Sequence, residues 1–181
     1  MTRETEAWVT TWSLVRVGAA RVGVVHGDAE SLAGWGFSQE VLSSPQGRLA
    51  AQRAFDQAQA DVFASSHTCL PVLQRLGDAG AIVNNGAAGM PNFRGVRYGV
   101  ATRISLFESR DAIYSMKIAG VFVEAIPLRY DHAAWEAHFL ELWPPGSAAH
   151  RSYYGRITGG PPYAMEQALR EAGKAYAREL G

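Results

Sequence analysis

Three residues with side chains that bind transition metals each follow an apolar run. His26 comes directly after the run 22–25, and His67 and Cys69 come shortly after the run 61–65. Imidazole and thiolate are common ligands of zinc and iron, and two donors two positions apart can serve one ion or adjacent ions. The residue types therefore predict a metal site. A histidine at a strand end is also common as a hydrogen-bonded structural residue, and both interpretations remain open.

The apolar runs have the pattern of short buried strands that end in polar turns. The runs and turns are 22–25 with His26, 61–65 with His67, and 81–83 with Asn84-Asn85-Gly86. Ligands of α/β sheets bind beyond the carboxyl ends of the strands, where loops turn side chains inward from a rigid frame. We therefore expect the two histidines to converge at one edge of a sheet.

The remaining pattern predicts an α/β fold. Strands are expected over 8–17, 98–107 and 112–127, with a hairpin between Phe107 and Ala112. Ser44 and Pro45 predict the start of a helix over 45–58. The residues expected on its buried face are Leu49, Ala54, Phe55 and Ala58. Further helices are expected from the N-cap Asp131 to about 142, over 148–156 and over 162–180.

Taken together, the polar turns resemble the last three motifs of the calcineurin-like metallophosphoesterases. The matching segments are Val24-Val25-His26-Gly27-Asp28, then Ser66-His67-Thr68-Cys69-Leu70-Pro71, then 83–91. In that family a histidine before glycine ligates the second metal, a Gly-His-x-His turn gives one histidine to each metal, and an Asn-x-Gly loop closes the site. The resemblance spans about 21–130 and implies half of a layered α/β sandwich, with a mixed sheet, helices and a helical C-terminal appendix.

Carried over, the resemblance makes His26 a ligand of the second metal and His67 the first histidine of the Gly-His-x-His turn. Cys69 stands where the second histidine belongs, and Ser66 replaces the glycine. The implied cofactor is a divalent metal ion, Mn, Fe or Zn. A thiolate can replace imidazole on zinc or iron, so Cys69 remains a candidate ligand.

The family's other motifs, Asp-x-His, Gly-Asp-x-x-Asp and Gly-Asn-His, do not occur in this sequence; Gly27-Asp28 is followed by Ser31 where the second aspartate belongs. We therefore expect a truncated or split copy of a phosphomonoester or phosphodiester hydrolase, weak or inactive alone. Two alternatives stay open. One is a non-catalytic interaction module with a vestigial metal pocket, and the other is a mononuclear metallohydrolase that uses His26, His67 and Cys69.

Three residues are candidates for contacting a phosphoester substrate. Trp35 could form an aromatic wall, or it could anchor its loop on the core. Asn85 could point into the site, although Asn-Gly is also a common tight turn. Arg94 could bind phosphate oxygens, or it could be an ordinary solvated arginine. The histidines of the C-terminal part, His132, His138 and His150, are assigned no function, and His138 is expected to be buried.

Composition limits the partners. Seventeen basic and seventeen acidic residues give zero formal net charge among 181 residues, so no partner nucleic acid or anionic membrane surface is expected. We expect a single domain over 1–181, with the helical appendix at 131–181, in the cytoplasm. A half-domain would expose apolar sheet surface, so a homo-oligomer or a missing N-terminal half is the expected macromolecular partner.

Overall fold

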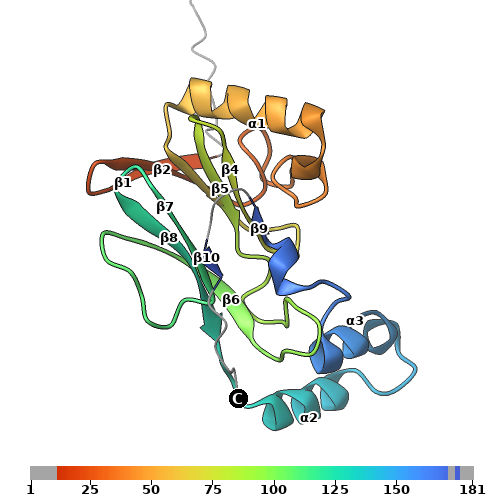
Figure 1. Ribbon diagram of the computed structural model, residues 1–181. Coiled ribbons are helices and arrows are strands. Elements are labelled where there is room, and N and C mark those ends of the chain that lie inside the picture. The colour runs from red at the N-terminus through yellow and green to blue at the C-terminus, as the bar shows by residue number, and fades with distance from the viewer. Residues whose placement is uncertain (1–11, 171–173, 176–181) are drawn as a thin grey trace, which may run out of the picture.

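The computed structural model describes residues 12–170 and 174–175. Within them, two β-sheets pack face to face, helix α1 covers the outer face of one sheet, and two further helices lie together at one end (Figure 1). The helices are α1 (Pro45–Ala58), α2 (His132–Leu142) and α3 (Ala148–Gly159), with short 3-10 turns η1 (Val41–Ser43) and η2 (Met165–Gln167). In the described part of the chain, no helix has the length and apolar character needed to cross a membrane.

The sheet beneath α1, called the large sheet, is mixed. Its strand order is β1-β2-β3-β5-β4-β9 over the described residues. Strands β2, β3 and β5 run parallel to one another, while β1 and β4 are antiparallel to their neighbours β2 and β5. The bounds are β1 (Trp12–Val17), β2 (Ala20–Val25), β3 (Val62–Ser65), β4 (Val72–Leu76), β5 (Gly80–Asn84) and β9 (Leu169–Arg170).

The three parallel strands are apolar because both of their faces are covered. On one face Phe63 and Ile82 pack under Phe55 of α1, and Phe55 and Phe63 meet at a ring-centroid distance of 4.9 Å. On the other face Val62 and Val83 pack against the second sheet. This double coverage fixes the strands rigidly, so the turns at their carboxyl ends have a defined geometry.

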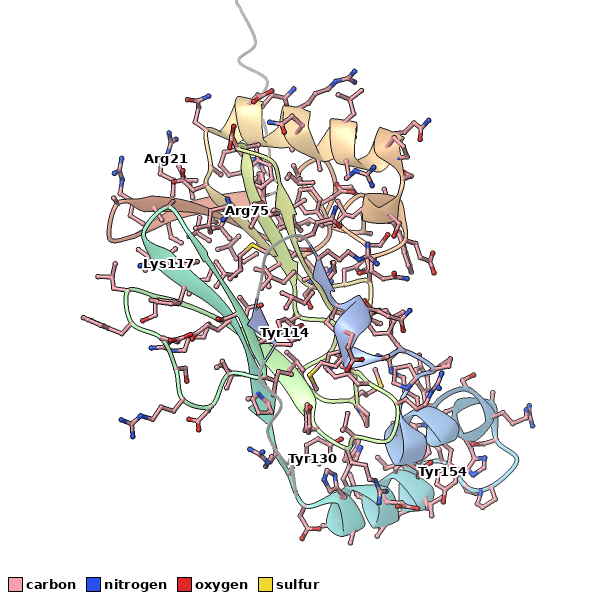
Figure 2. All side chains as sticks on the ribbon, in the orientation of Figure 1. Arg21, Arg75, Tyr114, Lys117, Tyr130 and Tyr154 are labelled. Atoms are coloured by element: carbon pink, nitrogen blue, oxygen red, sulfur yellow. The ribbon has the colours of Figure 1, made fainter. Side chains whose placement is uncertain are left out.

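The second sheet, called the small sheet, is antiparallel with the order β10-β7-β8-β6 in the described residues. Its strands are β6 (Gly99–Ser105), β7 (Tyr114–Ile118), β8 (Val121–Leu128) and β10 (Lys174–Ala175). Tyr114, labelled in Figure 2, is fully buried in the core between the two sheets.

The hairpin expected between Phe107 and Ala112 is wrong. Strand β6 pairs with β8 instead of β7, and the expected strand 112–127 is divided by a tight turn at Ala119-Gly120 into β7 and β8. Both turn residues have positive φ, 47° and 82°, as a two-residue hairpin turn requires. The sequence did not predict this turn, because Ala119 occupies a position where asparagine or glycine is usual.

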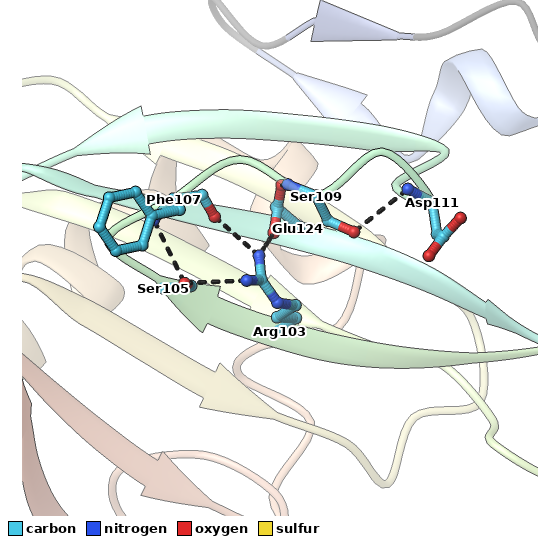
Figure 3. A network of polar contacts seen from close by, with 6 residues as sticks. All are labelled: Arg103, Ser105, Phe107, Ser109, Asp111 and Glu124. Atoms are coloured by element: carbon cyan, nitrogen blue, oxygen red, sulfur yellow. Dashed lines mark hydrogen bonds and ion pairs between the residues drawn. The ribbon is translucent and has the colours of Figure 1, made fainter.

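An ion pair with a buried carboxylate joins β6 and β8, as Figure 3 shows. Glu124 of β8 is fully buried and accepts hydrogen bonds from Arg103 of β6, its cross-strand partner, and from the backbone N–H of Ser109. The loop after β6 therefore passes over β8, and the hydrogen bond from Ser109 N to Glu124 holds it there. A buried carboxylate with one partner removed is strongly destabilising, so the pair specifies the strand order.

The predicted helices have mixed outcomes. The helix over 45–58 is confirmed, and Ser44 caps it by accepting a hydrogen bond from Gly47 N at 3.0 Å. Asp131 caps α2 in the same way, through Ala134 N. Leu49 was expected on the buried face of α1 but is exposed. His138 was expected to be buried but is also exposed.

The helix expected over 162–180 is wrong within the described residues. The chain forms η2 there and then joins both sheets, as β9 beside β4 and as β10 beside β7. The edge of β4 that does not face β5 can pair with another strand. Leu73 N of β4 donates to Ala168 O at 2.6 Å, and this hydrogen bond attaches the segment to the sheet. Within the described residues, the appendix at 131–181 is thus helical in α2, α3 and the short turn η2. Residues 171–173 and 176–181 lie outside the described part, as do residues 8–11 of the first expected strand.

Candidate functional site

His26 and His67 meet beyond the carboxyl ends of β2 and β3, as their positions after two neighbouring parallel strands predict. Their ring centroids are 5.0 Å apart with the rings at 63° to one another. The two turns are bonded together, because Ser66 N donates to His26 O at 3.1 Å and the Ser65 hydroxyl donates to Gly27 O at 2.6 Å. His26 is exposed and His67 is half-buried, so the pair is accessible from solvent.

The turn that carries His67 has an unusual backbone. His67 and Cys69 both lie in the left-handed region, with φ of 61° and 60°. Thr68 N donates to Ser66 O at 2.7 Å and Leu70 N donates to Thr68 O at 2.9 Å, so the chain reverses twice within five residues. Such conformations are unfavourable for residues other than glycine and persist where the surroundings enforce them, often at functional sites.

Asn84, at the end of β5, enforces this conformation. Its side chain is fully buried; the amide donates to Ser66 O at 2.6 Å and to the Thr68 hydroxyl at 2.9 Å, and its carbonyl accepts from Gly86 N. Asn84 therefore holds the His67 turn from the neighbouring strand. The sequence placed Asn84 at a strand end but did not distinguish its role from that of Asn85.

Trp35 lies beside the histidine pair. Its ring centroid is 5.9 Å from that of His67, and its side chain is exposed. The loop that presents it is organised by Asp28, whose carboxylate accepts hydrogen bonds from Ser31 N and Gly36 N, each at 2.9 Å. Trp35 therefore lies beside the histidines, and its contact with a substrate stays a prediction.

Cys69 is less closely associated with the two rings. Its exposed thiol donates to His67 O at 3.3 Å, and its own carbonyl accepts a hydrogen bond from Arg156 of α3. Among the described residues, no group of three or more histidines, cysteines or acidic residues is arranged to hold a metal ion. Whether Cys69 ligates a metal stays a prediction. Arg156, which the sequence did not single out, brings a positive charge to this turn from another part of the fold.

The other two candidate substrate contacts are Asn85 and Arg94. The Asn85 amide donates to Val100 O at 2.8 Å and so ties β5 to the start of β6. Arg94 is exposed, and its guanidinium makes no hydrogen bond or ion pair within the described part of the chain. Neither contact with a substrate is tested, and both stay predictions.

Two imidazoles at this separation suit one metal ion. A zinc–nitrogen bond is about 2.1 Å long, so two imidazoles bound at a tetrahedral angle have ring centres about 5 Å apart. The observed 5.0 Å agrees with that spacing. This separation is compatible with a shared divalent ion, but it is also that of an ordinary edge-to-face ring contact. The described residues do not complete a ligand set.

No protein-family model and no curated protein matches this sequence. Solved structures do resemble it. The hypothetical protein PH1004 from Pyrococcus horikoshii OT3 matches with a TM-score of 0.52 and 14% identity, over 84% of this chain and 51% of that one. A metallophosphoesterase from Sphaerobacter thermophilus matches with a TM-score of 0.51 and 18% identity, over 82% of this chain and 59% of that one.

The chain therefore spans between half and three-fifths of the length of these two proteins. At such identities the likeness concerns the fold and not the activity. It confirms the fold class predicted from the sequence: this chain shares the mixed α/β fold of a metallophosphoesterase.

Proposed function

We propose that this chain carries part of a metal-dependent phosphoester hydrolase site, in which His26 and His67 bind one divalent ion, Mn, Fe or Zn. The observation that carries the proposal is the 5.0 Å contact of the two imidazoles at the ends of neighbouring parallel strands. The fold shared with a metallophosphoesterase supports the reaction class. The substrate would be a phosphomonoester or phosphodiester.

The residues of the chain have separate roles in this proposal. His26 and His67 hold the ion, Asn84 fixes the His67 turn, and Trp35 forms a wall beside the histidines. When bound, a divalent ion supplies Lewis-acid polarisation of a phosphoryl oxygen and activates water. Because two imidazoles do not fill a coordination shell, the remaining protein ligands come from outside the described residues, in the same or another polypeptide.

Metal titration by calorimetry tests the ligand assignment. We expect about one Zn²⁺ or Mn²⁺ per chain, and an affinity at least tenfold lower in H26A and in H67A, because each removes one ligand. H138A is the matched control, since His138 is an exposed histidine on α2. Equal affinities in all four proteins would contradict the proposal.

The incomplete ligand set predicts little activity for the chain alone. Hydrolysis of a generic aryl phosphate should stay near background at saturating metal, because two imidazoles without a bridging carboxylate cannot clamp both the attacking and the leaving oxygen. Robust metal-dependent turnover would show that the set is complete, and would favour a mononuclear site with Cys69. In that case C69S should weaken metal binding as much as H26A does.

A non-catalytic interaction module is favoured by a different observation. Strand β1 has β2 as its one partner in the described residues, and Val15 and Val24 are exposed on the face of this hairpin that turns toward the small sheet. An apolar strand edge is a template for pairing with another chain.

A further inference from the structure

A pocket in another part of the fold is lined by neither His26 nor His67. It has a volume of about 300 Å³ and is formed where β6 begins, β8 ends and α2 starts. Figure 2 shows Tyr130 at the start of α2 in this region. The lining residues are Gly95, Val96, Arg97, Tyr98, Arg129, Tyr130 and His132. Its size lies at the lower end of the range for small-ligand sites.

The lining residues hold an unusual concentration of buried polar atoms without partners. They are Arg97 Nε, the hydroxyls of Tyr98 and Tyr130, and His132 Nδ1. Buried polar groups in native proteins are nearly always hydrogen-bonded. These four atoms are shielded from solvent, so a ligand in the pocket pairs with them only when their side chains turn toward it. Trp135 Nε1, one helical turn after His132, is unpaired as well.

The unpaired positive charge of the pocket is that of Arg129, because Glu136 neutralises the guanidinium of Arg97. Arg97 is held in place by Glu136 of α2 at 2.6 Å, and the Glu136 carboxylate also accepts a hydrogen bond from Tyr154 of α3 at 2.8 Å. Arg129 is exposed and makes no hydrogen bond or ion pair within the described residues. None of the described lining residues is acidic. One guanidinium is thus oriented in advance, while the other is free to bind.

The tyrosines are hydrogen-bond donors at neutral pH. Burial raises the pKa of Tyr98 to about 12, with Arg129 opposing the shift, and burial also raises the pKa of Tyr130, with Arg97 opposing it. Each phenol therefore keeps its proton and lies within the electrostatic influence of an arginine. Neutral hydroxyls and guanidinium groups complement an oxyanion, because all of them can donate to its oxygens.

We propose that this pocket binds the phosphate group of a small molecule. The donors belong to segments on different sides of the pocket, before β6, after β8 and in the first turn of α2. Donors from several directions suit a tetrahedral anion, because its oxygens point away from one another. The inference does not depend on metal binding by His26 and His67.

The test measures binding of inorganic phosphate by calorimetry and by thermal unfolding, in the presence of EDTA and at constant ionic strength. EDTA removes metal from the histidine pair, so failure here is separate from failure of the proposed function. The wild-type chain should bind phosphate and melt at a higher temperature in its presence. R129A should lower the affinity about tenfold, the order expected for a lost charge-assisted hydrogen bond.

Y130F provides a second readout that does not depend on Arg129. Removing an unpaired buried hydroxyl should leave the melting temperature without phosphate unchanged or higher, yet reduce the increase that phosphate causes. R53A is the control for net charge, because Arg53 is an exposed arginine on α1; it should bind phosphate as the wild type does.

Three results would overturn the proposal. The first is no phosphate binding at millimolar concentration. The second is an equal loss of affinity in R53A and R129A, which would indicate a general charge effect. The third is binding of acetate as tight as that of phosphate, which would show that the pocket does not select a tetrahedral anion.

Discussion

At the scale of single residues, the candidate metal site depends on a backbone conformation that its own sequence disfavours. His67 and Cys69 occupy the left-handed region, and a residue with a β-carbon is less stable there than glycine. The hydrogen bonds from the buried Asn84 to Ser66 and Thr68 compensate for this cost. Orientation of the His67 ring toward His26 is therefore maintained by a residue that touches neither ring.

Replacing Asn84 tests this dependence. N84A should lower the free energy of unfolding by about 3 kcal/mol, because it leaves buried donors and acceptors of the turn unpaired. Chemical denaturation measures the change. N85A is the matched control: the Asn85 side chain donates one hydrogen bond, to Val100 O, and its loss should cost about 1 kcal/mol. Similar losses in the two variants would show that Asn84 has no special role.

At the scale of elements, the small sheet is determined by a contact across strands and by a turn. Glu124 and Arg103 pair β8 with β6, and the Ala119-Gly120 turn joins β7 to β8. A two-residue hairpin turn with positive φ at both positions favours Asn-Gly. Ala119, at φ 47°, thus occupies a conformation better suited to asparagine.

The turn gives a prediction about stability. A119N should raise the free energy of unfolding by about 0.5 to 1 kcal/mol, because asparagine tolerates the left-handed conformation better than alanine does. G120A should lower it by about 1 kcal/mol for the converse reason, since Gly120 has φ 82° and open space around it. Urea unfolding of both variants measures the two shifts. A destabilised A119N would mean that the turn has another conformation.

At the scale of the whole molecule, each sheet shields the apolar face of the other from solvent. The β1–β2 end of the large sheet extends beyond the small sheet and is not shielded in this way. Val22 is buried between the sheets, whereas Val24, two positions further along the same face, and Val15 on β1 are about 40% exposed. The outer edge of β1 has no strand partner in the described residues. Together these features favour association with a second copy or with another polypeptide.

Sedimentation of the purified chain tests this association. We expect self-association at micromolar concentration, shifted toward monomer by V24E, because a charge on this face opposes burial of the valine. L49E is the matched control: Leu49 is exposed on α1, away from the β1–β2 end. A chain that stays monomeric throughout would leave the exposed valines without a role in association.

The sequence by itself determined the local features. The cap and proline at Ser44 and Pro45 fixed the start of α1, and the β-branched runs before His26 and His67 fixed two strands. Parallel neighbours have their carboxyl ends at one edge of a sheet, so convergence of the two histidines followed from the pattern. These signals lie within a few residues of one another, and short-range preferences are sufficient to specify them.

Only the tertiary structure decided which strands pair and which side chains meet across the fold. Three contacts join residues that are distant in the sequence. They are the ion pair between Glu124 and Arg103, the pairing of β9 with β4, and the hydrogen bonds of Asn84 to the His67 turn. The same holds for the pocket around Tyr98 and Tyr130, which is assembled from separate segments. Such contacts depend on how whole elements pack, and packing free energy is shared among many residues rather than encoded in any local motif.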